Sequence, residues 1–229
     1  MLTAQVKKDY GSFKLQDIKV KLKQGQLFGC LGPNGSGKST LVKILTGQIQ
    51  PTSGTVSVLG IDVVRNPVDA RKVMGIIPEQ ESPPSFLTVH EYLQFICKVR
   101  EVGNEKIDEW LSFFDFSHER DMLIKDLSRG TKQKVVATQA FIHSPRMVFI
   151  DEPLINLDPV MQKKFKKFLV DYAKKNTIFL STHILSIASE VCTDVGILKD
   201  GKLVLQDTMR NIRKGKKNLE DFFIGAIDG

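Results

Sequence analysis

The sequence of 229 residues lacks the features that would place a chain in a membrane or a secretory pathway. No apolar run approaches the length of about 18 residues that a membrane-spanning helix needs. Met1 is not followed by the basic and then apolar segment of a secretory signal. We therefore expect a protein that is made and kept in the cytosol.

Cysteine is scarce, and its placement excludes the usual cysteine chemistry. The three cysteines, Cys30, Cys97 and Cys192, stand far apart without a C-x-x-C pair. This spacing predicts neither a disulfide framework nor a zinc site. We expect all three to be small core residues.

Internal repeats and low-complexity segments are also missing, and the composition is that of a globular protein. The length allows one large domain, or one domain with a sizeable insertion, and a full hydrophobic core. The net charge of +7 is compatible with nucleic acid or an anionic membrane face as partner, and equally with a solvated surface.

A glycine-rich loop with a lysine stands at residues 32–40. It reads G-x-x-x-x-G-K-[ST], the pattern of phosphate-binding loops in nucleotide hydrolases. Glycines let the backbone curl so that its N–H groups point at an anion, and Lys38 can reach the β- and γ-phosphates. The residues expected to bind nucleotide here are Gly32, Pro33, Asn34, Gly35, Ser36, Gly37, Lys38, Ser39 and Thr40.

The flanking sequence supports this interpretation against that of an accidental glycine-rich turn. Residues 26–31 are a short apolar run suited to a buried strand, and residues 41–45 carry apolar side chains at helical spacing. A helix that begins near Gly37 would direct its positive dipole end at the phosphates.

Two acids follow a second apolar run, where α/β proteins bind ligands. Residues 146–150 predict a buried parallel strand, and Asp151 and Glu152 come directly after it. In a phosphoryl site Asp151 can hold Mg²⁺ and Glu152 can act as general base. His183 follows another buried strand and can hydrogen-bond a γ-phosphate. The alternative interpretation is that Asp151 and Glu152 cap a helix or form a surface ion pair.

Elsewhere the pattern predicts an α/β fold with a helical insertion. Residues 1–25, 55–59 and 73–78 predict strands, residues 82–127 predict helices, and residues 194–206 predict a hairpin. We expect Trp and Phe side chains of the helical part to be core. The helix caps expected are Thr88 in a capping box, Asn104, Ser128 and Asp158. The tail predicts a basic loop at residues 213–217 and a short terminal helix. His90, His118 and His143 are expected to be structural.

The order of motifs resembles that of the ATP-binding cassette (ABC) ATPases, the nucleotide-binding subunits of ABC transporters. Residues 32–40 match the Walker A loop, and Asp151-Glu152 falls in the Walker B position. Residues 127–134 are similar to the family signature, which marks this class apart from other P-loop ATPases. In that signature Arg129 replaces a glycine and Thr131 a glutamine of the commonest form, L-S-G-G-Q, which bears on the affinity or pace of dimer closure.

The resemblance implies a role for further residues. Tyr10 is similar to the aromatic residue that stacks on adenine, and Gln80 to the Q-loop glutamine. His183 falls in the switch-histidine position and Asp158 in the D-loop. Ser128 and Gly130 match the residues that contact the γ-phosphate of ATP held by the opposite subunit.

The fold implied is a P-loop NTPase (RecA-like) parallel-sheet core with an N-terminal antiparallel β subdomain and an α-helical insertion. Residues 1–229 would form one ABC ATPase domain, with residues 1–81 and 141–229 as core and 82–140 as helical subdomain. The cofactors implied are ATP and Mg²⁺. The metal would be held by Ser39, Gln80 and Asp151, and catalysis would involve Glu152, His183 and Gln80.

The implied partners are a second ABC subunit, identical or not, and integral membrane permease subunits. Two ATP molecules would be sandwiched in a head-to-tail dimer on the inner face of the membrane, and its motion would power transport. A groove near residues 80–95, with Pro83, Pro84, Ser85 and Phe86 in its lining, would receive a coupling helix.

Two features favour an exporter of the bacterial ABC-2 type, namely residues 132–134 after the signature and the ending near residue 229. The alternative is a soluble ABC ATPase that remodels nucleic acid or ribosomes, which the net charge allows. Long coiled-coil or zinc insertions of such relatives are missing, so no nucleic acid partner is expected. A P-loop kinase would not explain the signature.

Overall fold

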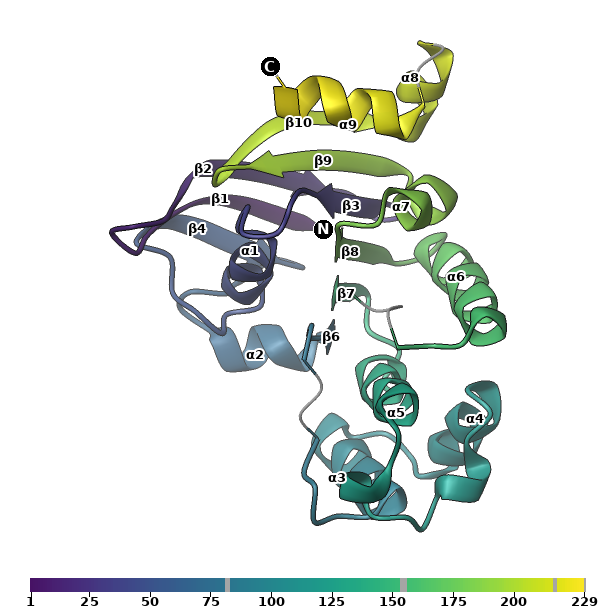
Figure 1. Cartoon of the computed structure of the whole chain (residues 1–229). Coiled ribbons are helices and arrows are strands. Elements are labelled where there is room, and N and C mark those ends of the chain that lie inside the picture. The colour runs from purple at the N-terminus through teal and green to yellow at the C-terminus, as the bar shows by residue number, and fades with distance from the viewer. Residues whose placement is uncertain (81–82, 153–155, 216–217, 229) are drawn as a thin grey trace.

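The computed structural model of the chain describes residues 1–80, 83–152, 156–215 and 218–228, and contains two sheets with flanking helices (Figure 1). The strands are β1 (Leu2–Asp9), β2 (Lys14–Leu22), β3 (Leu27–Leu31), β4 (Ser53–Val58), β5 (Ile61–Asp62), β6 (Met74–Ile77), β7 (Met147–Asp151), β8 (Thr177–Thr182), β9 (Asp194–Lys199) and β10 (Lys202–Thr208). The helices are α1 (Lys38–Leu45), α2 (Pro67–Lys72), α3 (Val89–Arg100), α4 (Glu105–Phe113), α5 (Arg129–Phe141), α6 (Pro159–Ala173), α7 (Leu185–Val191), α8 (Met209–Lys214) and α9 (Leu219–Asp228), with short 3-10 turns at Ser117–Glu119 and Ile124–Asp126.

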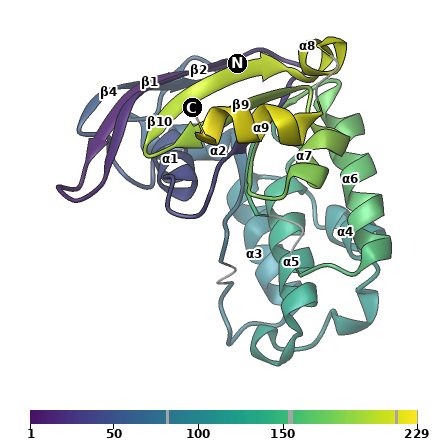
Figure 2. The ribbon, with the colours of Figure 1, turned by 45° about the horizontal axis from the view of Figure 1, so that its top comes forward.

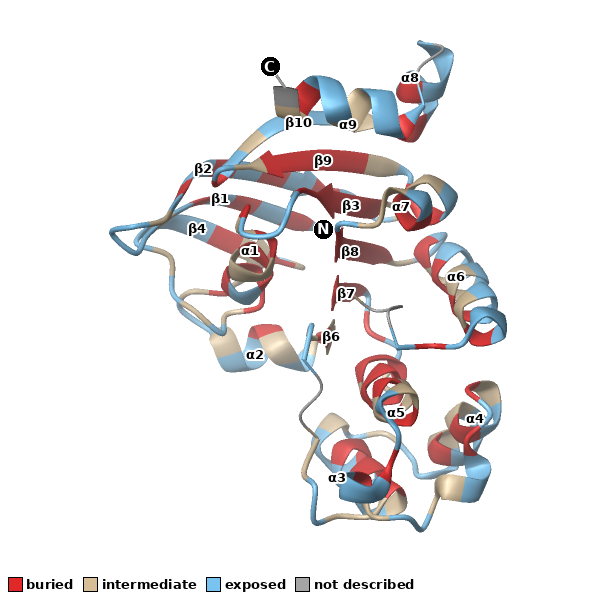
Figure 3. Cartoon of the chain, in the orientation of Figure 1, coloured by how far each residue is buried: buried red, intermediate tan, exposed pale blue. Residues whose placement is uncertain are grey.

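The larger sheet has the order β10-β9-β3-β8-β7-β6, in which all neighbours are parallel except β10 and β9. Its central strands are buried along their whole length, as the red ribbons of Figure 3 show. Unbroken apolar runs produce such strands because side chains on both faces must pack. The predicted α/β class is confirmed.

Alternate side chains of these strands belong to two separate cores. Phe28 and Phe179 point to the face covered by α1 and the smaller sheet, whereas Leu27 and Ile178 point to the face covered by α6 and α7. Helix α9 lies beside β9 and α7 (Figures 1 and 2). Side chains therefore pack against both faces of the sheet, and this packing fixes the position of its strand ends.

The smaller sheet is antiparallel, with the order β2-β1-β4-β5. Along β1 the buried and exposed residues alternate, so Leu2, Ala4 and Val6 face the core and the residues between them face solvent. The N-terminal antiparallel strands and the hairpin at residues 194–206 are thus confirmed.

The helical part holds an aromatic core. The Trp110 ring lies within 6 Å of the rings of Phe113, Phe114, Phe141 and Phe168, measured between centroids. Phe114 and Phe116 are buried, and Trp110 and Phe113 pack against the core partly buried, as predicted, whereas Phe86 and Phe95 are exposed. The prediction is therefore confirmed only in part. Helix α5 continues from this cluster to Phe141 beside β6, and the subdomain boundary placed at residue 140 stays a prediction.

Three of the four predicted helix caps are present. Thr88 and Glu91 form a reciprocal capping box, Ser128 Oγ accepts from the Thr131 N–H, and Asp158 Oδ1 accepts from the Met161 N–H. The prediction for Asn104 is wrong. Its backbone already has helical angles, φ −68° and ψ −18°, and its side chain makes no cap bond.

The structure also corrects the account of the tail. Arg213 and Lys214, expected in a basic loop, lie in the last turn of α8, whereas residues 216 and 217 lie outside the described part. The predicted terminal helix is present as α9.

All three cysteines are buried and free, as expected. Across the described ranges, no helix has both the length and the apolar content needed to cross a membrane.

Removal of the Phe165 ring is expected to destabilise the fold strongly. Phe165 is fully buried among the rings of Phe114, Phe141 and Phe168. Phe165→Ala should lower the free energy of unfolding by about 3–5 kcal/mol in a denaturant titration. The matched change Phe95→Ala, at a residue that is 56% exposed, should lower it far less. Equal losses in both variants would contradict this packing.

His143 is expected to make stability depend on pH. Burial, together with the charge of Arg100, lowers the pKa of His143 from 6.5 to about 4. The unfolded chain therefore binds this proton more tightly, so stability is present above pH 6.5 and is lost as the pH falls toward 4. His143→Gln should reduce the stability difference between pH 7 and pH 5, whereas His118→Gln, at an exposed site, should leave it unchanged. An unaltered difference in His143→Gln would refute the assignment.

Candidate active site

The glycine-rich loop connects β3 to α1, and at two of its glycines there is no space for a side chain. A Cβ atom at Gly32 would lie 2.2 Å from the Leu198 carbonyl oxygen. Gly37 has φ +104°, and a Cβ there would lie 2.7 Å from Phe13 and Leu15. The loop is therefore held between β9 and the turn that joins β1 to β2.

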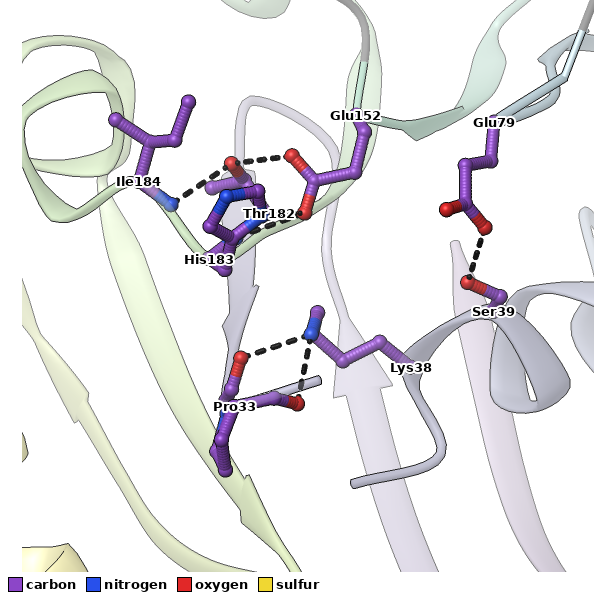
Figure 4. Close-up of polar contacts among 9 residues, drawn as sticks. Pro33, Lys38, Ser39, Glu79, Glu152, Thr182, His183 and Ile184 are labelled. Carbon is purple, nitrogen blue, oxygen red and sulfur yellow. Dashed lines mark hydrogen bonds and ion pairs between the residues drawn. The ribbon is translucent and has the colours of Figure 1, made fainter. Parts of the chain in front are cut away.

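Lys38 lies folded over this loop (Figure 4). Its Nζ donates to the carbonyl oxygens of Gly32, at 2.8 Å, and Pro33, at 3.1 Å. Because Gly37 supplies no side-chain cap, the N–H groups at the start of α1 face the loop without a competing side chain. This arrangement suits an anion, and the binding of nucleotide by residues 32–40 stays a prediction.

The remaining residues of the loop differ in how far they are exposed. Ser36 is buried, and its Oγ has no hydrogen-bond partner among the described residues. Pro33, Asn34 and Gly35 are exposed at the tip of the loop, and Thr40 lies in the first turn of α1.

Asp151 ends β7 beside the loop and is 3% exposed. Burial raises the pKa of its carboxyl group. Its Oδ1 has no hydrogen-bond partner among the described residues. A buried carboxylate oxygen without a partner is costly unless a ligand approaches it, which makes it a candidate cation ligand.

Ser39 lies near Asp151, but its partner differs from the one that the sequence suggested. The Ser39 Oγ donates to Glu79 Oε2 at 3.2 Å (Figure 4), and the side chain of the predicted metal ligand Gln80 is exposed at the mouth of a groove. The sequence analysis missed Glu79. The available signal was its place just after a buried strand, at the same sheet edge as Asp151.

These oxygen donors fit Mg²⁺, which prefers carboxylates, hydroxyls and phosphates. Within the described residues, no group of three or more His, Cys, Asp and Glu side chains is arranged to hold a metal ion. A magnesium ion at Ser39 and Asp151 would therefore take the rest of its ligands from water and from phosphate oxygens.

Glu152 is held by three contacts from the neighbouring strand end (Figure 4). Its Oε2 accepts from Thr182 Oγ1 at 3.0 Å, and its Oε1 accepts from the His183 N–H at 2.9 Å. The His183 Nδ1 lies 2.6 Å from the same Oε1 and donates its proton, because an ionised carboxylate can only accept. Glu152 also has φ +51°, and this strained backbone directs its side chain toward His183.

The Tyr10 ring is 48% exposed in the turn between β1 and β2. This is the turn whose Phe13 ring packs against Gly37, so Tyr10 belongs to the surroundings of the phosphate loop. Lys8 Nζ lies 5.0 Å from the ring centre. An exposed ring of this kind can stack on a flat base.

Ser128, Gly130 and Asp158 line a different hollow, together with Thr131, Lys134, Asn156 and Leu157. A Cβ at Gly130 would lie 2.7 Å from the Asn156 carbonyl oxygen, so the starts of α5 and α6 pack closely here. The Thr131 Oγ1 lies 2.9 Å from Ser128 Oγ. None of residues 32–40 lines this hollow, so one chain does not bring the two predicted parts of the site together.

The groove that contains Gln80 is lined mainly by α1, α2, α3 and α5. Lys43, Arg71 and Arg100 give it a positive rim, and Glu79 and Asp151 connect it to the phosphate loop. Residues 83–86 are not among its described lining residues, and their place in a docking groove stays a prediction. Phe86 is 76% exposed.

Comparison with known proteins identifies the family of this chain. The model of the family described as "ABC transporter" matches residues 15–155. The chain belongs to this family. It is 33% identical over 224 residues to "Bacitracin transport ATP-binding protein BcrA" of Bacillus licheniformis, which covers 96% of the chain and 73% of that protein.

Two further comparisons agree with this. "Probable multidrug ABC transporter ATP-binding protein YbhF" of Escherichia coli is 31% identical over 94% of the chain, which spans 38% of that protein. A solved structure described as "Structure of ATP binding subunit of ABC transporter" has a TM-score of 0.91 and 26% identity, over 99% of both chains.

The protein is thus an ABC ATPase, the ATP-binding and ATP-hydrolysing subunit of a transporter. Its parallel sheet, antiparallel strands and helical insertion form the P-loop NTPase fold that the sequence analysis predicted. ATP-binding subunits of this family dimerise and work with membrane components.

Proposed function

We propose that this ABC ATPase powers export through an ABC-2 type membrane subunit, by closing two chains over two Mg²⁺-ATP. The observation that supports this proposal most strongly is the position of Glu152. Thr182 and His183 donate hydrogen bonds to its carboxylate beside the loop that contains Lys38. A carboxylate oriented in this way next to a phosphate site is suited to activate water. The names of the relatives, which concern bacitracin and multidrug transport, support export.

In one chain, the nucleotide would lie along the glycine-rich loop. Tyr10 would stack on adenine, and the N–H groups of residues 32–40 would donate to the phosphates. Lys38 would exchange its bonds to main-chain carbonyls for bonds to the β- and γ-phosphates. Mg²⁺, held by Ser39 and Asp151, would neutralise charge on the phosphates during transfer.

Glu152 would accept the proton of the attacking water. The bonds from Thr182 and His183 keep its carboxylate in one orientation, and this preorganisation favours a general base. His183 is 44% exposed and follows the end of β8, so it can also donate to the γ-phosphate. Its contact with Glu152 would let it report whether that phosphate is present.

The second chain would supply the missing half of the site. Ser128 and Gly130 lie at the start of α5, where N–H groups and the Ser128 hydroxyl can donate to a phosphate. Asp158 lies in the same hollow. Since this hollow is separate from the phosphate loop of its own chain, a head-to-tail dimer would join the two.

The positive groove would receive the membrane subunit on the inner face of the membrane. Among the described residues, the guanidinium groups of Arg71 and Arg100 donate only to neutral main-chain carbonyl oxygens. They therefore suit a cytoplasmic segment that carries an acidic side chain. Because Glu79 and Asp151 lie in the same groove, a docked segment would be next to the γ-phosphate side of the nucleotide.

Glu152→Gln is expected to retain ATP binding and to slow hydrolysis about 10²–10⁴-fold, because the amide cannot take a proton. Binding of a fluorescent ATP analogue and release of phosphate would be measured on the same preparation. Glu190→Gln, at a surface ion pair with Lys166, is the control and should behave as wild type. Full hydrolysis by Glu152→Gln would remove Glu152 from its role.

Arg71→Glu is expected to weaken association with the membrane subunit roughly tenfold or more, since it places an acid opposite an acid. The tagged chain would be purified from gently solubilised membranes of its native host, and the accompanying multi-span protein quantified. Arg65→Glu, on the exposed surface, is the control. If the wild type instead came down with ribosomes or nucleic acid, the remodelling ATPase would replace the transporter.

A further inference from the structure

Two hydroxyl groups meet at the start of α5, one from Ser128 and one from Thr131. The Ser128 Oγ accepts from the Thr131 N–H at 3.1 Å, and the two hydroxyl oxygens lie 2.9 Å apart. Thr131 therefore approaches Ser128 with both its main chain and its side chain. Glutamine, which stands at this position in the commonest form of the signature, has no hydroxyl, so this pair depends on Thr131.

The two residues differ in their access to solvent. Thr131 borders the hollow at the start of α5 but is only 8% exposed, whereas Ser128 is exposed in the same hollow. Within the described part of the chain, Ser128 Oγ is the one hydrogen-bond partner of the Thr131 hydroxyl. A proton on Thr131 thus has one acceptor, while a proton on Ser128 can also be given to a group in the hollow.

This difference in burial decides the direction of the bond between the two hydroxyls. A hydroxyl carries one proton and two acceptor lone pairs. If Ser128 donated, the buried Thr131 proton would have no acceptor among the described residues, which is unfavourable. Thr131 is therefore the donor, and Ser128 Oγ accepts both the N–H and the O–H of Thr131. Both lone pairs of Ser128 are then used, and its own proton faces the hollow.

The hollow suits a negatively charged acceptor for that proton. Lys134 lines it, and among the described residues the Lys134 ammonium donates only to the main-chain carbonyl oxygen of Asp115. Asp158, the acid of the hollow, already accepts from the Met161 N–H. Because Ser128 has a proton to give and no lone pair left, it can bond to a phosphate oxygen but cannot act as a ligand of a cation.

We propose that Thr131 is a positioning residue, whose hydroxyl turns the Ser128 proton toward the γ-phosphate of the ATP held by the opposite subunit. The proposal rests on the head-to-tail dimer described above. The pair keeps the Ser128 donor oriented before the dimer closes, so less order has to be imposed when the phosphate arrives. Thr131 itself does not contact the nucleotide.

Three substitutions separate this role from packing. Thr131→Val keeps the branched shape and removes the hydroxyl, so the Ser128 proton is no longer directed into the hollow. Thr131→Ser keeps the hydroxyl and removes only a methyl group. Thr138→Val is the matched control on the same helix, because Thr138 is fully buried, its Oγ1 has no partner among the described residues, and it does not line the hollow.

The test measures dimer formation of the whole chain by sedimentation at saturating Mg²⁺-ATP, with Glu152→Gln in every preparation to stop turnover. Thr131→Val should weaken each site about threefold, and the dimer, which has two sites, roughly tenfold. Thr131→Ser and Thr138→Val should stay within about twofold of the parent. Binding of ATP by the separate chain, which uses the Lys38 loop, should be the same in all of them.

A double variant shows whether Thr131 acts through Ser128. Ser128→Ala removes the proton that Thr131 orients, so addition of Thr131→Val should cause no further loss of dimer. An unchanged dimer constant in Thr131→Val, the same weakening in Thr131→Ser, or an equal further loss in the Ser128→Ala background overturns the proposal. Failure of the parent to dimerise with ATP would instead refute the proposed dimer, so the two failures are distinguishable.

Discussion

The parallel pairing of β7 with β8 is the constraint on which the active site depends. It places Asp151 opposite Ser181, so that the residues just beyond, Glu152 on one strand and Thr182 and His183 on the other, meet at one edge. The pairing is secured because both strands are buried on both faces, between α1 on one side and α6 and α7 on the other. Since a slip of one residue would exchange the two faces, the packing of the sheet also fixes the register of the catalytic side chains.

The two halves of the proposed site differ in how they are built. The phosphate loop, Asp151 and Glu152 depend on strand ends of one rigid sheet. Ser128 and Asp158 instead lie at helix starts, where each side chain accepts a hydrogen bond from one N–H of its own helix. The groove with Arg71 and Arg100 lies against the first half through Glu79 and Asp151. Docking of a membrane subunit and binding of the metal would therefore act on neighbouring side chains.

Most of this could be predicted from the sequence, because it rests on local patterns. Unbroken apolar runs gave the buried strands, and Ser128 and Asp158 could be recognised as caps from the residues that follow them. Two kinds of feature could not. Helices α2 and α8 have only six residues each and show no full period of apolar side chains. The contact of Ser39 with Glu79, and not with Gln80, depends on where β6 ends and on Pro78. Strand patterns do not place the end of a strand to within one residue.

The central claim is that a complete site takes its phosphate loop from one chain and its Ser128 hollow from another. A mixing experiment tests it most directly, with one chain carrying Lys38→Ala and the other Ser128→Ala, each inactive alone. In a head-to-tail dimer of the two, one site combines the intact Lys38 of one chain with the intact Ser128 of the other, so the mixture should regain ATP hydrolysis. If the mixture stayed as inactive as its components, although both variants bind each other, the site would not be shared and the account would be contradicted.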